Sequence, residues 1–172
     1  NADIKVHIMR GSTSNVEVRG YRNLVAITET YIANGKLIVK YQHEYYNVKN
    51  SNIEVYITMP ELNYVGTNGS GDVWVDGFNN NNLSAYINGS SNINMSNCVY
   101  DHILLDINSS GNIVAAGLLS NRCDATIHGS GDIEISCSQN LKARIYGSGD
   151  IRYWGTPSLD VAISGSGSVT RQ

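Results

Sequence analysis

The acidic residues best placed to do chemistry in this chain belong to a Gly-Ser-Gly-Asp phrase that returns at nearly fixed intervals. The phrase stands at Gly69–Asp72, Gly129–Asp132 and Gly147–Asp150, and related tetrapeptides begin at Gly89, Ser109 and Gly165, so the period is 20 residues and then 18. Glycine-rich Asp turns bind calcium in β-rolls built from a nonapeptide repeat, which is half of the shorter period. A row of calcium ions is therefore the first chemistry that this spacing suggests.

The aspartates occupy the fourth position of the phrase, and we call the residues at this position in successive repeats a column. This column is not uniformly charged. In chain order it consists of Asp72, Asn92, Asn112, Asp132, Asp150 and Ser168. Each neutral side chain would weaken a metal row that depends on charge, whereas Asp, Asn and Ser can all bond their own backbone in a tight turn. We therefore predict structural turns without a metal, in which glycine supplies a positive φ and Asp or Asn supplies the turn bond. The turn-forming glycines are Gly69, Gly71, Gly129, Gly131, Gly147 and Gly149.

The remaining residues with catalytic potential form no recognised motif. The histidines fall at different phases of the repeat, without HxH or HExxH spacing, at His7, His43, His102 and His128. No serine lies in a G-x-S-x-G elbow, and the glycines match neither a dinucleotide-binding loop nor a Walker loop. The sequence thus predicts a protein that is not an enzyme and holds no cofactor.

Aromatic residues form the most plausible functional surface. Tyr64 and Tyr86 occupy outward phases on adjacent repeats, and Trp74 is outward on the strand that follows the first phrase. Together the three would give a flat surface on which sugar rings or a protein partner could stack. The alternative is structural, because tyrosine also suits half-exposed strands and the segment 42–52 could fold over these rings.

Apolar columns on both sides of each phrase define the elements that carry these residues. The position two residues before the start of the phrase is almost always isoleucine, in the series Thr67, Ile87, Ile107, Ile127, Ile145 and Ile163. Apolar and polar positions alternate before and after the turn, which is typical of strands with one buried face. Repeats this short cannot form propeller blades, and they lack the helix of a leucine-rich repeat. We predict an all-β, single-stranded parallel β-helix with coils of 18–20 residues.

The residues predicted to point outward provide a second test of how successive repeats align. Stacked coils would place Asp124, Lys142 and Asp160 in one row of alternating charge, and Glu134 beside Arg152. Opposite charges favour such neighbouring positions.

We expect one domain over residues 1–172, with regular repeats over residues 63–172 and irregular N-terminal coils over residues 1–62. In the first part, the segment from Ile8 to Val18 resembles a coil with a longer turn. Asn34-Gly35 separates two apolar stretches, Val25 to Ile27 and Leu37 to Val39, as in a strand-turn-strand unit. Residues 42–52 and 79–82 lack the period and predict protruding loops.

Composition excludes some partners. Twelve basic and fifteen acidic residues give a formal charge of -3 and a pI near 5.7, without the basic field that nucleic acids require. No stretch approaches the ~20 apolar residues that cross a bilayer, and the start at Asn1 fits a mature form whose targeting segment has been removed. We predict the cysteines, Cys98, Cys123 and Cys137, to be mainly small core residues, with a Cys123–Cys137 disulfide as the lesser alternative.

The run from Ile53 to Val169 resembles the head-GIN domain family. The resemblance rests on the Met59-Pro60-x-Leu62 entry and on repeated units such as Leu141 to Ile151, with the pattern Leu-x-Ala-x-Ile-x-Gly-Ser-Gly-Asp-Ile. Members of this family are described as autotransporter-type adhesins of Bacteroidetes. The resemblance implies a right-handed β-helix exported to the periplasm or cell surface, often behind a lipoprotein-type signal, and it supplies no catalytic residues.

The sequence therefore favours a non-enzymatic envelope or surface module that binds a glycan or an extracellular protein. A structural role in an envelope assembly is the alternative, because the last coil leaves an open edge through which chains could associate. A polysaccharide-active β-helix enzyme is less favoured, since the turns over residues 83–170 are short and carry no cluster of acids.

Overall fold

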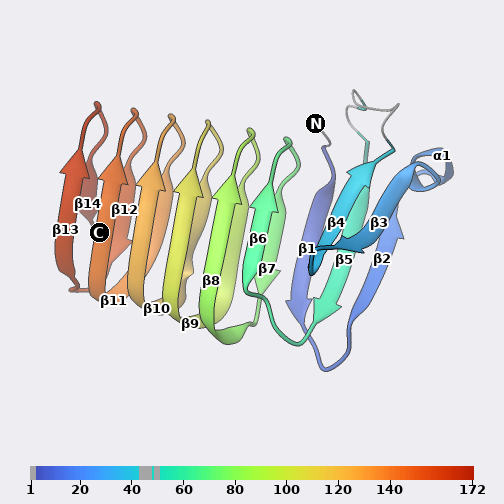
Figure 1. The fold of residues 1–172 in the computed structure, drawn as a ribbon, viewed down its shortest axis with the longest axis horizontal. Helices are drawn as coiled ribbons and strands as arrows, with labels where there is room; N and C mark the ends of the chain where they lie inside the picture. The colour runs from blue at the N-terminus through green and yellow to red at the C-terminus, as the bar shows by residue number, and fades with distance from the viewer. Residues whose placement is uncertain (1–2, 43–47, 49–50) are drawn as a thin grey trace.

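The computed structural model describes residues 3–42, 48 and 51–172, and it is almost entirely β-structure (Figure 1). Two layers of strands enclose one core. The front layer, which faces the viewer in Figure 1, contains β6 (Tyr64–Thr67), β8 (Asn79–Ile87) and β13 (Ser158–Ile163). The back layer contains β7 (Val73–Asp76), β12 (Ile151–Trp154) and β14 (Val169–Arg171).

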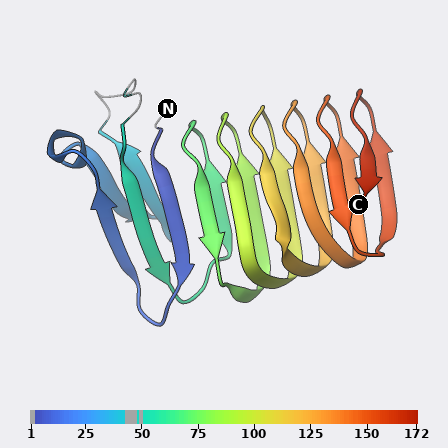
Figure 2. The same cartoon turned by 180° about the vertical axis from the view of Figure 1, so that it is seen from behind.

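Three long strands belong to both layers. They are β9 (Ile93–Ile107), β10 (Ile113–Ile127) and β11 (Ile133–Ile145). Strand β11 pairs with β12 through residues 133–136 and with β13 through residues 140–145, so its two halves lie in different layers. Each chain segment between two turns thus crosses from the back layer to the front layer (Figure 2). The predicted parallel β-helix is confirmed for this part of the chain.

The register agrees with the predicted columns. Ile87, Ile107, Ile127 and Ile145 are fully buried and lie in line across the front layer. On the outside, Asp124 pairs in register with Lys142, which pairs with Asp160. Arg152 Nη1 lies 3.6 Å from Glu134 Oε1 on the back layer. The alternation of apolar and polar residues therefore fixes which side of each strand enters the core.

The glycines of the phrase serve a different purpose from the predicted one. Positive φ angles occur at Gly20, Gly35, Gly77 and Gly155, and not in the phrase. Instead, successive turns stack so closely that a Cβ on Gly147 would lie 1.8 Å from the carbonyl oxygen of Gly129. That carbonyl already accepts the N–H of Ser148 at 2.9 Å. Glycine is required here because there is no space for a side chain between the turns.

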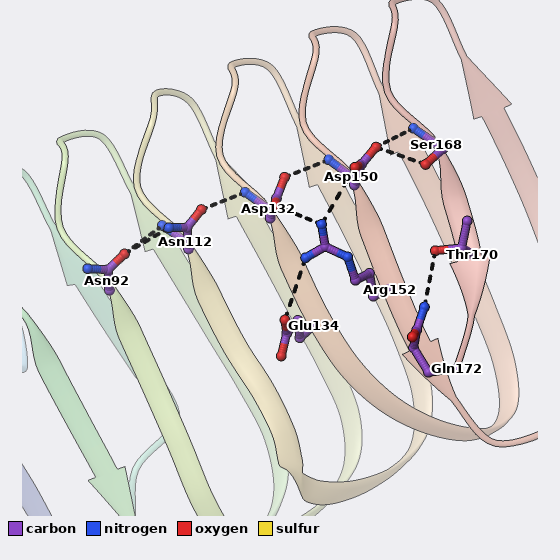
Figure 3. A network of polar contacts seen from close by, with 9 residues as sticks. All are labelled: Asn92, Asn112, Asp132, Glu134, Asp150, Arg152, Ser168, Thr170 and Gln172. Carbon is purple, nitrogen blue, oxygen red and sulfur yellow. Dashed lines mark hydrogen bonds and ion pairs between the residues drawn. The ribbon is translucent and has the colours of Figure 1, made fainter.

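The Asp/Asn column acts between coils, whereas the prediction placed its hydrogen bonds within each turn (Figure 3). Asp72 Oδ1 accepts the backbone N–H of Asn92 at 2.9 Å, and Asp132 Oδ1 accepts that of Asp150 at 2.8 Å. The same contact links the intermediate coils, and Arg152 Nη2 lies 3.3 Å from Asp132 Oδ2. The column therefore links each turn to the next by a hydrogen bond from side chain to backbone.

In the first third of the chain, the described residues form no coil, which corrects our expectation for residues 1–62. Strands β1 (Lys5–Arg10) and β5 (Glu54–Met59) extend the back layer in the order β7-β1-β5, and β2 (Asn15–Arg19) closes it antiparallel to β5. Strands β3 (Thr28–Ala33) and β4 (Lys36–Tyr41) form a separate antiparallel hairpin. Its turn places Asn34 and Gly35 at positive φ, as hairpin turns of this kind require.

Three local predictions have different outcomes. Val25, expected in a strand, ends the short helix α1 (Arg22–Val25). Residues 79–82, expected in a loop, begin β8 and pair with β9. The expected loop over residues 42–52 lies mostly outside the described residues.

The cysteines are buried and free, as core residues, and the described residues contain no helix long and apolar enough to span a membrane.

The stacking of the turns predicts a large effect of one methyl group. Gly149→Ala would place a Cβ 1.9 Å from the carbonyl oxygen of Gly131, so two turns must separate. We expect a loss of about 1–3 kcal/mol in the free energy of unfolding, the usual cost of overpacking. Gly117→Ala is the control, because its Cβ would lie 3.3 Å from the nearest atom. Equal denaturant midpoints for the two variants would refute the steric explanation.

The Asp column also predicts a dependence of stability on pH. Hydrogen bonds from the hydroxyl and the N–H of Ser168 lower the pKa of Asp150 below its ordinary value of 3.8. Such a carboxylate stabilises the fold above the unfolded-state pKa, and the contribution is lost as pH falls through the folded-state pKa. Asp150→Asn keeps the acceptor oxygen, as Asn112 does, so its melting temperature should fall less steeply below about pH 4. Identical pH profiles for the variant and the original protein would contradict this assignment.

Candidate binding site

Four side chains stack in a row on the outside of the back layer. They come from adjacent strands, since His7 of β1 lies in register with both Tyr56 of β5 and Trp74 of β7. The ring centroids of His7 and Tyr56 are 4.8 Å apart and those of His7 and Trp74 4.7 Å apart, with the planes nearly parallel. Arg19 of β2 continues the row, its guanidinium carbon 4.4 Å from the Tyr56 centroid. The spacing between strands therefore sets the spacing between rings.

A hydrogen bond fixes one end of this row. The Tyr56 hydroxyl donates to Glu54 Oε2 at 2.5 Å, which raises the pKa of Tyr56 and lowers that of Glu54. Arg19 is in turn paired with Glu17 at 2.7 Å. Both Tyr56 and Arg19 are thus held by carboxylates beside the row.

A second row lies on the outside of the front layer. Tyr64 and Tyr86 stack with their centroids 5.5 Å apart. On its other side, Tyr64 contacts the ammonium of Lys36, which lies 3.4 Å from the ring centroid. Gly66 makes room for this arrangement, because a Cβ there would meet the Tyr64 hydroxyl at 2.8 Å. This contact joins the tip of the β3–β4 hairpin to β6.

The structure does not bring the three predicted residues into one surface. Tyr64 and Tyr86 lie together on the front layer, whereas Trp74 is on the back layer beside His7. Moreover, rings that stack along the sheet present their edges to solvent, while a sugar stacks on an open ring face. Both faces of Tyr64 are taken, one by Lys36 and one by Tyr86. A flat platform for sugar rings is therefore absent at Tyr64.

A groove of about 700 Å³ opens between β4 and β6. Its floor includes Ile4, which precedes β1, and the inward residues Val6 and Ile8 of β1, and its walls include Val39 and Val65. Both Tyr64 and Tyr86 line it, together with the charged residues Lys36 and Glu61. In Figure 1, β1 is visible behind the space that separates β6 from β4. Two of the three predicted residues thus border the groove.

The groove exists because the two sheets do not join. Among the described residues, β6 pairs with β8 alone and β4 pairs with β3 alone. The core beneath is correspondingly less covered, since Ile8 is 7% exposed while Ile93 and Ile113 in the regular coils are fully buried. The apolar core is therefore accessible from outside at this point.

The other titratable residues are dispersed. His102 Nε2 lies 3.0 Å from Asp124 Oδ2, and His128 stacks on Tyr146, while His43 lies outside the described residues. No group of three potential metal ligands occurs among the residues that the structure describes. A hydrogen bond to Cys137, together with burial, raises the pKa of the Cys123 thiol, which makes it a poor nucleophile.

Sequence reasoning missed Lys36, His7 and Tyr56. All three lie in the irregular first third, where no repeat phase assigns a position. The alternation of Val6, His7 and Ile8 does mark His7 as outward, but only the pairing of β1 with β5 and β7 shows what it stacks on. The contact of Lys36 with β6 had no signal in the sequence.

Solved structures share this fold. A putative adhesin from Bacteroides fragilis NCTC 9343 is 21% identical, with a TM-score of 0.73 over 98% of this chain and 88% of that one. A protein from Parabacteroides distasonis ATCC 8503, described as a putative lipid binding protein, is 20% identical, with a TM-score of 0.58 over 99% and 89% of the two chains. A putative adhesin from Parabacteroides merdae ATCC 43184 is 21% identical, with a TM-score of 0.51 over 98% and 88%. A comparison with curated proteins gave no match.

The family comparison covers nearly the whole chain. Residues 1–171 match the model of the family described as "Putative auto-transporter adhesin, head GIN domain". This match also includes the residues before Ile53, where the run that carries the resemblance begins. The chain belongs to the head GIN domain family of adhesin-like proteins.

Proposed function

We propose that this domain is a non-enzymatic recognition module of the bacterial cell envelope or surface, and that it binds an extracellular partner at the groove between β4 and β6. The observation that carries the proposal is the groove itself, which gives outside access to apolar core side chains. The family and the structural neighbours, described as adhesins or as lipid binding, support a binding role. We propose that the domain is exported to the periplasm or the outer membrane and is held there by a lipid anchor. On the outer membrane it would meet such a partner.

The chemistry of the site favours a protein partner over a glycan. Both faces of Tyr64 are covered, so stacking on a sugar would first require the contact with Lys36 to break. The groove instead offers aliphatic side chains, which suit apolar residues of a protein or the acyl chain of a lipid. The lipid binding description of one neighbour makes an acyl chain the second ligand class to test.

An array of extracellular-matrix proteins and glycans tests this proposal. Tyr64→Ala removes an aromatic side chain that lines the groove, and it should weaken binding to any protein that the array identifies by about tenfold or more, as truncation of an aromatic interface residue does. Trp74→Ala is the matched control on the opposite layer and should leave affinity unchanged. Melting temperatures would show that both variants fold. Loss of binding only in Trp74→Ala would place the site on the back layer and refute the groove.

A second candidate function is a structural role in an assembly, and the C-terminal coil favours it. Leu159, Val161 and Ile163 are 49%, 41% and 43% exposed, although their partners in register on β11 are buried. This coil therefore presents an apolar row and a free strand edge to a further β-element.

Light scattering after size-exclusion chromatography tests self-association through this coil. The protein should form dimers or larger species at high concentration, and Val161→Lys should make it monomeric because a charge would enter the apolar row. Val114→Lys is the control, since it makes the same change at an exposed residue of β10, away from the open edge. A protein that stays monomeric at every concentration would exclude this form of assembly.

A further inference from the structure

We propose that the groove is an acceptor site for an extended strand of another polypeptide, which pairs with β6 and fills a vacant strand position in the front layer. The inference rests on the proposed function of the same site and specifies the chemistry of its ligand. The ligand is a segment with apolar side chains at alternate positions.

The two layers differ by one strand at the groove. Beyond β7, the back layer continues with β1, β5 and β2, in that order. Beyond β6, the described part of the front layer continues with the hairpin strands β4 and β3, which are not paired to β6. Ile4, which precedes β1, and Val6 and Ile8 of β1 line the groove, and Ile4 and Ile8 keep exposed fractions of 5% and 7%, whereas inward isoleucines of β9, β10 and β11 have none. An added strand beside β6 would cover Ile4, Val6 and Ile8 as the front-layer strands cover the rest of the core.

The backbone of β6 presents hydrogen-bonding groups to the groove. The carbonyls of Asn63 and Thr67 accept the N–H groups of Ser84 and Asn88, so these residues face β8. Because backbone groups alternate in direction along a parallel strand, those of Tyr64 and Gly66 face the groove. No described residue pairs with this edge of β6.

These polar groups favour a peptide over an acyl chain. An acyl chain in the groove would remove the N–H and C=O groups of Tyr64 and Gly66 from water without replacing their hydrogen bonds, which is costly. An extended peptide satisfies them and also covers the apolar floor. Addition of a strand to an exposed sheet edge is a common mode of peptide recognition, in which the backbone supplies affinity and alternate side chains supply specificity.

The structure also indicates which side chains such a strand would need. Residues directed inward would meet Val6 and Ile8, so they should be aliphatic. Residues directed outward would lie beside Lys36 and Tyr64, so polar side chains suit them. The front-layer strands of the protein itself have this pattern, for example Leu141, Ala143 and Ile145 with Lys142 and Arg144 between them.

A synthetic peptide with the sequence of residues 140–146 is therefore the probe. Labelled with a fluorophore, it should bind the intact protein in a saturable manner, and hydrogen exchange at the amides of Tyr64 and Gly66 should become slower. Methylation of the backbone nitrogen at the Ala143 position removes one hydrogen bond to β6 and should weaken binding about tenfold. A peptide with its inward and outward residues exchanged should bind no better than background.

Two variants locate the site. Val6→Trp fills the groove and should reduce peptide affinity at least tenfold, a change of about 1.4 kcal/mol or more, and circular dichroism at the assay temperature checks that the variant keeps its β-structure. Val114→Trp makes the same kind of change on the outside of the back layer and should have no effect. Binding that persists in Val6→Trp and slows exchange over residues 158–163 instead would overturn the proposal, because the peptide would then be stacking on the open C-terminal coil.

The same variants separate this inference from the proposed function. The fluorescent fatty acid cis-parinaric acid provides the first comparison. If it binds the original protein but not Val6→Trp, and if the peptide does not bind, then the ligand is an acyl chain and the strand proposal fails. If Val6→Trp blocks binding to an array protein but the N-methylated and unmodified peptides bind equally, the groove is the site but strand pairing is refuted. If Val6→Trp leaves array binding intact, the groove is not the functional site at all.

Discussion

The contact between successive turns is the constraint on which the rest of this structure depends. Parallel strands pair at about 4.8 Å, and the turns must keep that distance if both layers are to stay in register. The carbonyl oxygen of Gly129 lies where a Cβ on Gly147 would have to stand, so glycine permits the spacing. The Asp132 side chain accepts a hydrogen bond from the backbone N–H of Asp150 in the next turn. The same tetrapeptide therefore supplies both the glycine that allows close stacking and the carboxylate that bonds the next coil.

This constraint explains why function is more readily placed at the ends of the stack than along it. The inner strands β9, β10 and β11 are paired on both edges, and their inward residues are covered by the neighbouring coils. The outer faces carry rows of stacked or paired side chains, such as Glu134 with Arg152, whose contacts are directed along the stack. Unpaired backbone and accessible apolar residues therefore occur where the repeat begins, beside β6, and at β13, where the apolar row is exposed.

The sequence predicted the repeating part well because one physical rule, alternation around a glycine turn, applies to each coil. The roles predicted for the glycines and aspartates of the phrase were wrong. A pattern within one repeat cannot distinguish a hydrogen bond to its own turn from a hydrogen bond to the next coil. The sequence also placed Trp74 with Tyr64, although the turn between them sends the two strands into different layers. The strand pairing of the first third could not be predicted from the repeat pattern, because β1 and β5 are far apart in the chain.

The groove follows from that same long-range pairing. Strand β1 lies in the back layer between β7 and β5, at the strand spacing of that layer. After β1 the chain continues to β2, which is also in the back layer, and not to a front-layer strand. The hairpin β3–β4 covers part of the vacancy, and Lys36 of β4 contacts the Tyr64 ring of β6 without any backbone pairing between these two strands. A single contact between side chains is far weaker than a ladder of backbone hydrogen bonds. Among the described residues, the junction between the irregular and the regular parts therefore shares with the C-terminal coil a strand edge without a backbone partner, and at the junction that edge borders a groove.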